Sequence, residues 1–337
     1  MRSPNARVTS AIRHPKSEIR NRAGFTLVEL LVVIAIIGVL TALISVVAAA
    51  AWRQAKEAAV KVEVDGLSAG FKAYKEKYGE YPPNFNDLDA VKRHLRKAFP
   101  RITSNELKFV DALNTAGYVP RPDEAVFFWL GGMSSDPQHP LTGPGGPFFA
   151  GPNAEAAKFA NGLFDFSKRN SLFDFDLTRL GPAEEDVTNG VVKFTGRQKF
   201  LQPHPDNPQR LVFIALPVYT PTGTDEARAE PYVYFDTSRT KPSPTDDETL
   251  LYVPGDGSRG VAVPHRRAGG GGLEYVNPES FQVLSAGLDD RWSIGVPAGT
   301  SSVPAANIAT FPNGPFINEM ADNLTNFNTG SLEDSQP

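Results

Sequence analysis

Near its start, the chain changes from polar to uninterrupted apolar sequence. No charged residue occurs from Leu30 to Ala51, a run of 22 positions. At about 1.5 Å per residue, a helix of this length spans about 33 Å, enough to cross a hydrocarbon core of about 30 Å. The pattern therefore predicts a membrane-spanning helix. One carboxylate, Glu29, directly precedes the run, and an unpaired charge at such a place is costly enough to indicate a function.

The helical pattern continues beyond Ala51 but becomes amphipathic. Apolar residues recur at steps of three and four, slipping by one residue near Gly66, and charged residues fill the other faces. The apolar positions are Trp52, Ala55, Ala59, Val62, Leu67, Phe71, Tyr74 and Tyr78. This helix is expected to end near Gly79, because Pro82 and Pro83 cannot continue it. The apolar half requires lipid or other copies of itself, whereas the striped half requires a globular domain packed against it.

Three later segments carry the residue types of β-strands. They are rich in β-branched and aromatic residues and are separated by turn residues. They are Arg210–Thr220, Glu230–Ser238 and Ser280–Gly287. We expect an antiparallel sheet to bury the three strands against the striped helix.

The part of the chain before these strands has weaker patterns. Leu88–Phe99 has the pattern of a short amphipathic helix, and Asp111–Tyr118 has that of another helical turn. Gly131–Gly151 is dense in glycine and proline and is expected to be a loop.

Charge divides the chain at about residue 24. Residues 1–24 carry six basic side chains against Glu18 alone, a net charge of +5, so the formal net charge of −4 leaves −9 for the remainder. The basic stretch is expected to stay cytoplasmic under the positive-inside rule, which places the C-terminal body across the membrane. An acidic body argues against a nucleic-acid-binding surface, which needs basic residues to neutralise phosphates. The lack of cysteine excludes disulfides and thiolate chemistry.

The residues before the apolar run form a recognisable motif, Arg22-Ala23-Gly24-Phe25-Thr26-Leu27-Val28-Glu29. This motif resembles the processing site of type IV prepilins and type II secretion pseudopilins. In that family, an inner-membrane aspartic peptidase cuts the basic leader after the glycine and methylates the new N-terminus. The resemblance implies cleavage between Gly24 and Phe25, N-methylation of Phe25, and a place for Glu29 as the fifth residue of the mature chain. There its carboxylate would meet the N-terminus of a neighbouring subunit and set the register of assembly, which satisfies both charges.

The resemblance also implies a pilin-like α+β fold. A long N-terminal spine helix, transmembrane in its first half, would pack on a C-terminal antiparallel β-sheet body with long loops. We expect a cytoplasmic basic leader that is removed (1–24), a transmembrane and assembly half of the helix (25–51) and its amphipathic half (52–81). A loop-rich insertion with short helices (82–200) and a β-rich body with a polar tail (201–337) would follow.

Candidate chemistry is limited to one metal site. Major pseudopilins hold a calcium ion in their C-terminal loop, and by position the resemblance implies Asp289 and Asp290 as ligands, although the full ligand pattern is not evident and Arg291 follows directly. Calcium binds six to eight oxygens, often from carboxylates in a glycine-containing loop; solvated turn acids are the alternative. Sequence motifs of serine hydrolases, zinc proteases and P-loop enzymes are missing, and the five histidines are scattered. No catalytic site is predicted.

The predicted function is a pilin-like filament subunit rather than an enzyme, most specifically a pseudopilin of a type II secretion system whose periplasmic filament drives protein export. Its expected partners are prepilin peptidase, other copies of itself, other pseudopilins, the inner-membrane assembly platform and membrane lipid. We expect a single-pass protein of the inner membrane with a cytoplasmic N-terminus and a periplasmic body. Two alternatives stay open. One is a major or minor type IV pilus pilin for adhesion, motility or DNA uptake. The other is a membrane-tethered extracytoplasmic enzyme or binding protein, which the size of residues 84–200 favours.

Overall fold

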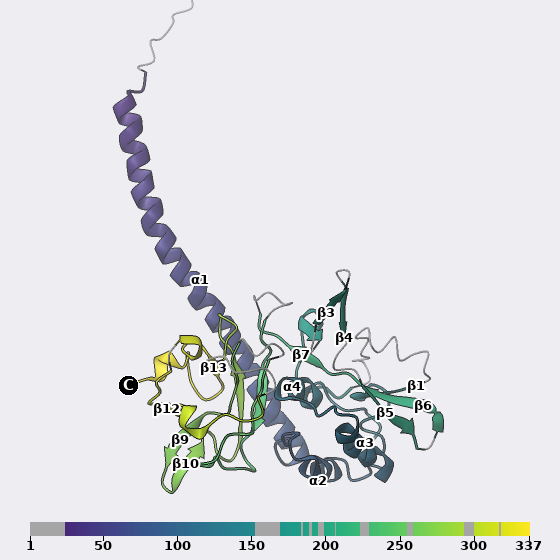
Figure 1. The fold of residues 1–337 in the computed structure, drawn as a ribbon. Helices are drawn as coiled ribbons and strands as arrows, with labels where there is room; N and C mark the ends of the chain where they lie inside the picture. The colour runs from purple at the N-terminus through teal and green to yellow at the C-terminus, as the bar shows by residue number, and fades with distance from the viewer. Residues whose placement is uncertain are drawn as a thin grey trace, which may run out of the picture. The chain divides into compact units, whose positions relative to one another are not determined.

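The computed structural model describes residues 24–151, 169–182, 185–188, 191–194, 199–205, 207–222, 229–254, 259–292, 300–316 and 318–337. Residues 1–23 of the predicted leader lie outside these ranges. The chain divides into two compact units, Met1–Ala51 and Trp52–Pro337. One helix, α1 (Leu27–Tyr78), contributes to both units (Figure 1).

Helix α1 has the extent that the sequence predicts. It contains 52 residues and ends at Tyr78. Gly79 follows with a φ of +84°, and its N–H donates to the carbonyl of Lys75 at 2.7 Å. A glycine in the left-handed region is the usual end of a helix, because it adopts this conformation without steric cost. The prediction that the helix ends near Gly79 is confirmed.

The second half of α1 packs on the body through one buried face. Its buried apolar side chains, each no more than 1% exposed, are Val60, Val64, Leu67, Phe71 and Tyr74. The ring of Phe71 stacks on the ring of Tyr234 with centroids 4.1 Å apart, and it lies 5.3 Å from the ring of Phe281. The predicted fold class, a long helix packed on an antiparallel sheet, is confirmed.

The predicted stripe was wrong in its first half. Trp52 and Val62 are 67% and 70% exposed, and Ala55 is also exposed. The buried face continues upstream from Leu67 through Val64 and Val60 at regular steps of three and four, without the slip expected near Gly66.

The body contains thirteen strands in the described residues. They are β1 (Phe148–Gly151), β2 (Leu180–Pro182), β3 (Glu185–Thr188), β4 (Val191–Phe194), β5 (Lys199–His204), β6 (Asn207–Ile214), β7 (Pro217–Tyr219), β8 (Val233–Asp236), β9 (Arg266–Gly269), β10 (Gly272–Tyr275), β11 (Phe281–Ser285), β12 (Thr310–Phe311) and β13 (Leu324–Thr325). They form the sheets β1-β6-β5, β10-β9-β12, β13-β11-β8, β2-β7 and β3-β4. All pairs are antiparallel except β12 with β9. The predicted segments Glu230–Ser238 and Ser280–Gly287 contain β8 and β11, which confirms them. The segment Arg210–Thr220 is extended as predicted, but it holds two strands, β7 and most of β6, and β6 begins earlier, at Asn207.

The sheet β13-β11-β8 lies between two cores. Tyr234 of β8 and Val283 of β11 are opposite each other in the register and belong to the core that includes the buried face of α1. The alternate residues Val233, Phe235 and Leu284 belong to a second core. Successive side chains of a strand point to opposite faces, so both faces of this sheet are covered, which explains why β8 and β11 are buried throughout.

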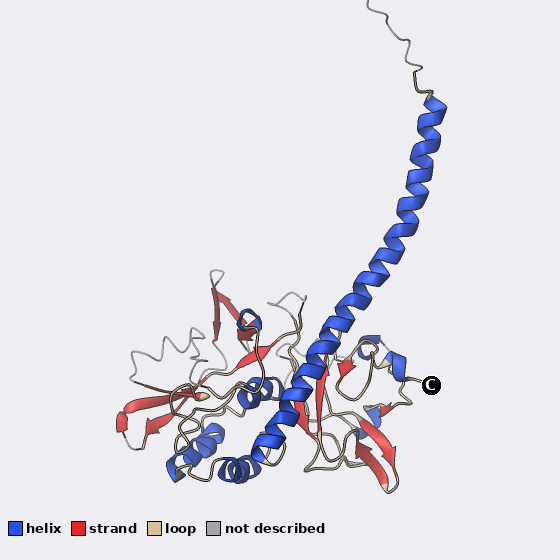
Figure 2. Cartoon of the chain, turned by 180° about the vertical axis from the view of Figure 1, so that it is seen from behind, coloured by secondary structure: helices blue, strands red, loops and turns tan. Residues whose placement is uncertain are grey.

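Three further helices follow in the body: α2 (Leu88–Ala98), α3 (Ser104–Thr115) and α4 (Pro122–Leu130). Helices α3 and α4 pack on strands of the sheets, and α2 packs on α3. They lie on one side of the body half of α1, while β9 and β10 lie on the other (Figure 2). The first two helices confirm predictions, but α4 was not expected. All of its residues from Asp123 to Leu130 are buried, so it lacks the polar face that reveals a helix in sequence. The segment Gly131–Gly151 is irregular as predicted, except that it ends in β1.

Candidate functional site

The predicted cleavage site lies immediately before α1. Gly24 and Phe25 have no regular secondary structure and are exposed, Phe25 to 76%. Apart from the residues bonded to Gly24, no described atom lies within 4 Å of the point that a β-carbon on Gly24 would occupy. The peptide bond between these two residues is therefore accessible to an enzyme in the single chain.

Glu29 closes the first turn of α1 by a capping box with Thr26. Its Oε2 atom accepts hydrogen bonds from the backbone N–H of Thr26 at 2.9 Å and from its hydroxyl at 2.8 Å. In return, the N–H of Glu29 donates to Thr26 Oγ1 at 3.2 Å. A Thr-x-x-Glu box satisfies backbone donors that the helix leaves unpaired. The interaction fixes the carboxylate over the first turn, where it is bonded to the N–H of Thr26, the residue after Phe25.

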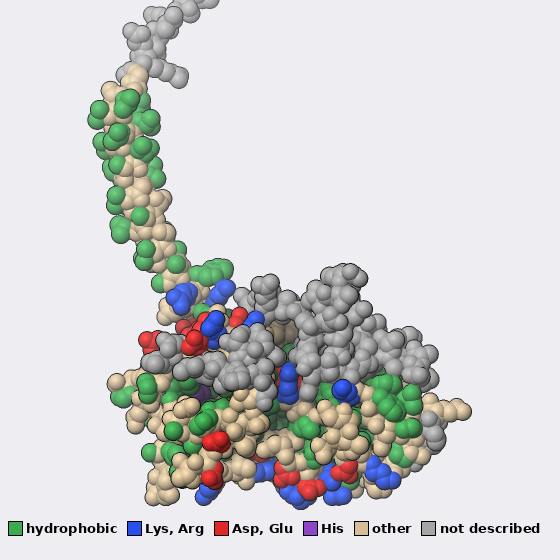
Figure 3. All heavy atoms as spheres, in the orientation of Figure 1, with side chains coloured by type: hydrophobic (Ala, Val, Ile, Leu, Met, Phe, Trp, Pro, Cys, Tyr) green, Lys and Arg blue, Asp and Glu red, His purple; other side chains and the backbone are tan. Residues whose placement is uncertain are grey.

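The segment of α1 that follows is apolar on every side. Its large apolar side chains from Leu27 to Val47 are 43–79% exposed in the single chain (Figure 3). Its two hydroxyl residues pair with the backbone: Thr41 Oγ1 donates to the carbonyl of Ile37 and Ser45 Oγ to that of Ala42, both at 2.8 Å. A span in lipid requires such internal pairing. By length and composition, α1 is the one helix among the described residues that could cross a membrane.

A buried ion pair joins the second half of α1 to the body. Glu63 Oε1 lies 2.8 Å from Arg179 Nη1. Its Oε2 accepts from the hydroxyl of Tyr232 at 2.6 Å and from the N–H of Thr222 at 3.1 Å. One carboxylate therefore holds three segments of the body against the helix.

The two predicted calcium ligands do not converge. Asp289 Oδ1 accepts from the N–H of Arg291 at 2.9 Å, while Asp290 Oδ1 accepts from the N–H of Glu230 at 3.3 Å. Desolvation and the nearby charge of Asp322 raise the pKa of Asp289 to about 6. In the described part of the chain, no group of three or more His, Asp or Glu residues could hold a metal ion. Calcium binding by Asp289 and Asp290 stays a prediction.

Asp322 is the acidic neighbour that sequence reasoning missed. Its Oδ2 accepts from the N–H of Leu288 at 2.8 Å, and its Oδ1 is buried without a hydrogen-bond partner among the described residues. Gly287 has a φ of +73°, and a β-carbon there would lie 2.5 Å from Asp322. Asp322 is separated from Asp289 by 33 positions, so the sequence offered no local signal for the pair.

The buried histidine His94 forms a structural link rather than an accessible base. Its Nε2 lies 2.7 Å from the hydroxyl of Tyr74 on α1, and its Nδ1 lies 2.7 Å from Glu80 Oε1. Burial lowers the pKa of His94 to about 4, against the opposing effect of Glu80. The ring is therefore neutral near pH 7; it accepts from the tyrosine and donates to the glutamate, which ties α2 to α1.

Comparison with known families identifies the N-terminal segment. Residues 19–45 match the prokaryotic N-terminal methylation motif. No curated protein and no solved structure matches the chain. The matched segment contains Gly24, Phe25 and Glu29 and most of the apolar half of α1, and this motif implies processing by prepilin peptidase and assembly with other pilin-like subunits. The chain therefore carries the N-terminal signature of type IV prepilins and pseudopilins, on a helix that is long and apolar enough to anchor it in a membrane by a single span.

Proposed function

We propose that the chain is a pseudopilin of a type II secretion system. Prepilin peptidase cuts it between Gly24 and Phe25 and methylates Phe25, and the mature chain is then extracted from the inner membrane into a periplasmic filament. The observation that carries this proposal is the position of Glu29. Its carboxylate lies over the first turn of α1, bonded at 2.9 Å to the N–H of Thr26, the residue that directly follows the N-terminus that cleavage would create.

Assembly changes the partner of this carboxylate. Within the described part of the single chain, the Glu29 carboxylate is bonded to Thr26 through the capping box. Cleavage before Phe25 creates an α-amino group, which is mostly cationic at neutral pH because its reference pKa is near 8. A carboxylate at the centre of a membrane span costs about 2.5–3.5 kcal/mol on insertion scales, and less near the interface, where Glu29 lies. When the carboxylate pairs with the ammonium of a neighbouring subunit, the pairing offsets the free-energy cost of placing each of the two charges near lipid. The alignment of subunits that allows this pair is therefore favoured over other alignments.

The proposed function includes an orientation of the chain in the membrane and a structural rather than an enzymatic role. The basic residues before Gly24 keep the N-terminus cytoplasmic, and the body beginning at Trp52 is periplasmic. The body contacts other pseudopilins, and the spine contacts lipid before assembly and other spines afterwards. The assembly platform of the inner membrane extracts the subunit, and no catalytic step is assigned to the chain itself.

Three variants separate the charge of Glu29 from its capping role. Glu29→Gln keeps a side chain that can close the capping box but removes the charge, Glu29→Ala removes both, and Thr26→Val removes the hydroxyl cap and keeps the charge. We expect peptidase processing of all three, with incorporation into filaments lost for both Glu29 variants and kept for Thr26→Val. Incorporation is measured by cross-linking and pull-down of sheared filaments. Normal incorporation of Glu29→Ala would refute the assigned role.

The location of the filament distinguishes the two pilin-like systems. A pseudopilin filament stays in the periplasm, and its loss blocks protein export. Surface pili that contain this chain, with export intact, would assign it to a type IV pilus instead. Turnover of a substrate by the body, residues 52–337, would support the membrane-tethered enzyme.

The calcium ion implied by the pseudopilin resemblance is proposed at Asp289 and Asp290. The buried Oδ1 of Asp322, which has no hydrogen-bond partner among the described residues, adds a third carboxylate whose charge acts on Asp289. Calcium added to the metal-free full chain should raise its melting temperature. Asp289→Asn and Asp290→Asn should each abolish this increase, and Glu279→Gln, an exposed acidic position elsewhere in the body, is the matched control and should preserve it. An unchanged response of both aspartate variants would remove the site.

A further inference from the structure

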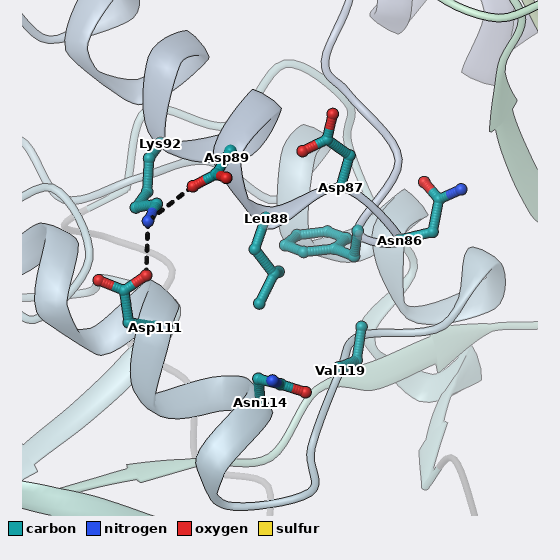
Figure 4. A pocket seen from close by; sticks show the side chains of 9 residues that line it. Asn86, Asp87, Leu88, Asp89, Lys92, Asp111, Asn114 and Val119 are labelled. Atoms are coloured by element: carbon teal, nitrogen blue, oxygen red, sulfur yellow. Dashed lines mark hydrogen bonds and ion pairs between the residues drawn. The ribbon is translucent and has the colours of Figure 1, made fainter.

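Two adjoining depressions form one groove on the body. The larger, of about 610 Å³, lies between the start of α2 and the end of α3, and the smaller, of about 210 Å³, is bordered by Thr249–Leu251. Phe85, Asn86 and Val119 line both. The depressions are therefore neighbouring parts of a groove that runs from the helices to an extended segment of chain. Figure 4 shows the larger part, with Leu88, Asn114 and Val119 around the open space.

The larger part of the groove is acidic. Asp87, Asp89 and Asp111 line it together with a single cation, Lys92. The ammonium of Lys92 lies 2.9 Å from Asp89 Oδ1 and 2.6 Å from Asp111 Oδ1 (Figure 4), and Asp87 caps α2 through the N–H of Ala90 at 2.9 Å. Arg93 lies beside the lining, with its Nη2 atom 3.7 Å from Asp87 Oδ2, so three carboxylates face two cations and one negative charge is in excess. This part of the groove is complementary to a cationic side chain.

The smaller part of the groove exposes unpaired backbone. Glu248 forms an isolated β-bridge with Val303, and Tyr252 forms one with Ala262. Between these two bridges, the N–H and C=O groups of Thr249 and Leu251 have no hydrogen bond to any described residue. In extended chain, alternate residues direct these groups to opposite sides. The pattern therefore leaves one short open edge, and both of its residues line the groove.

We propose that this groove binds an extended segment of another protein that carries a lysine or arginine. The segment pairs its backbone with Thr249 and Leu251, as a strand added to a sheet edge. Its apolar side chains pack on Phe85 and its cationic side chain reaches the carboxylates at α2 and α3. Asn86, which lines both parts, has a side-chain amide without a partner among the described residues and bonds to the backbone of the segment between its two ends.

The test uses the full chain in lipid nanodiscs and a fluorescein-labelled peptide in which lysine, valine and threonine alternate. Binding is measured by fluorescence polarisation. Asp87→Asn with Asp111→Asn removes two charges while asparagine still caps α2. We expect this double variant to weaken binding about fivefold or more, since each exposed charge pair contributes about 0.2–1 kcal/mol. Glu279→Gln, an exposed acidic position outside the groove, is the matched control and should leave binding unchanged.

Altered peptides test the remaining contacts. Two peptides are N-methylated at alternate residues, one at the odd and one at the even positions. The peptide whose methylated residues face Thr249 and Leu251 cannot pair as a strand and should bind about tenfold more weakly, because each lost hydrogen bond costs about 0.5–1.5 kcal/mol. Replacement of lysine by glutamate should abolish binding. Equal affinity of the glutamate peptide, or equal affinity of the Asp87→Asn, Asp111→Asn variant and wild type, would overturn the proposal. Self-association of the chain that these substitutions disrupt without peptide would also overturn it, since the occupant would be a second copy. None of these readouts depends on filament assembly.

Discussion

The carboxylate of Glu63 offers a sharp test of how the spine helix is held to the body. Substitution Glu63→Ala removes the acceptor of Arg179, Tyr232 and Thr222 in one step. The side chain of Arg179 is only 9% exposed. Its guanidinium would keep the carbonyl of Thr220 at 3.1 Å and the exposed Asp176, whose Oδ2 lies 3.5 Å from Arg179 Nε, but lose its closer and less exposed counter-charge.

The expected cost follows from these contacts. Breaking a buried ion pair by removal of one partner costs about 3–5 kcal/mol, because the remaining charge stays buried and uncompensated. Glu63 is 18% exposed at its side chain and Asp176 stays 3.5 Å from Arg179, so the charge is partly compensated and the lower end of that range, about 3 kcal/mol, is expected. For the 286 residues of the body, Trp52–Pro337, each kcal/mol shifts the melting temperature by about 2 °C. The melting temperature should therefore fall by about 6 °C.

Thermal unfolding of the full chain in nanodiscs, followed by tryptophan fluorescence, measures this change. Trp129 and Trp292 are buried in the body and report on its unfolding. The matched control is Asp65→Asn on the same helix, where the Asp65 side chain is 57% exposed and pairs with Lys61 four residues away. That pair contributes about 0.3–0.5 kcal/mol. A Glu63→Ala protein that melts within about 2 °C of Asp65→Asn would refute the reasoning.

Three further predictions concern the body. The pKa of His94 is lowered to about 4 from 6.5, so the stability contributed by the neutral ring is present above pH 6.5 and is lost as the pH falls toward 4. The free energy of unfolding, measured by urea titration, should fall by about 3 kcal/mol over this range. This part of the pH dependence should be absent in His94→Gln. Glu106 is fully buried and accepts from the N–H of Thr142 at 3.1 Å, so Glu106→Ala should cost about 2–4 kcal/mol and expose residues 131–146 to limited proteolysis. Gly287→Ala forces a left-handed φ and a clash with Asp322, so its melting temperature should fall, whereas Gly271→Ala, with open space around it, should melt near the wild type.

Features encoded by neighbouring residues could be predicted from the sequence. The length of α1 follows from one uncharged run, one amphipathic stretch and the stop at Gly79, all visible locally. The strands β8 and β11 follow from short β-branched and aromatic segments. The capping box of Thr26 and Glu29 could also have been predicted, because Thr-x-x-Glu before an apolar run is its sequence pattern.

Features that depend on contacts distant in sequence could not be predicted. The partners of Glu63 come from positions 179, 222 and 232, so its role as an anchor has no local pattern. The stripe on α1 was misplaced because alanine and valine at positions 55–62 fit either of two faces, and only packing against the body selects Val60 and Val64. Helix α4 is buried all round, which removes the polar face that pattern reading needs.

The central claim is that the chain is processed as a prepilin, and the mass and N-terminal sequence of the protein purified from membranes test it most directly. The account predicts a mature chain that begins at N-methylated Phe25 and retains Glu29 as its fifth residue. An intact chain that begins at Met1, or a cut downstream near Ala48–Ala51, would contradict it. Either result would show that the motif at residues 19–45 does not direct the processing of this chain.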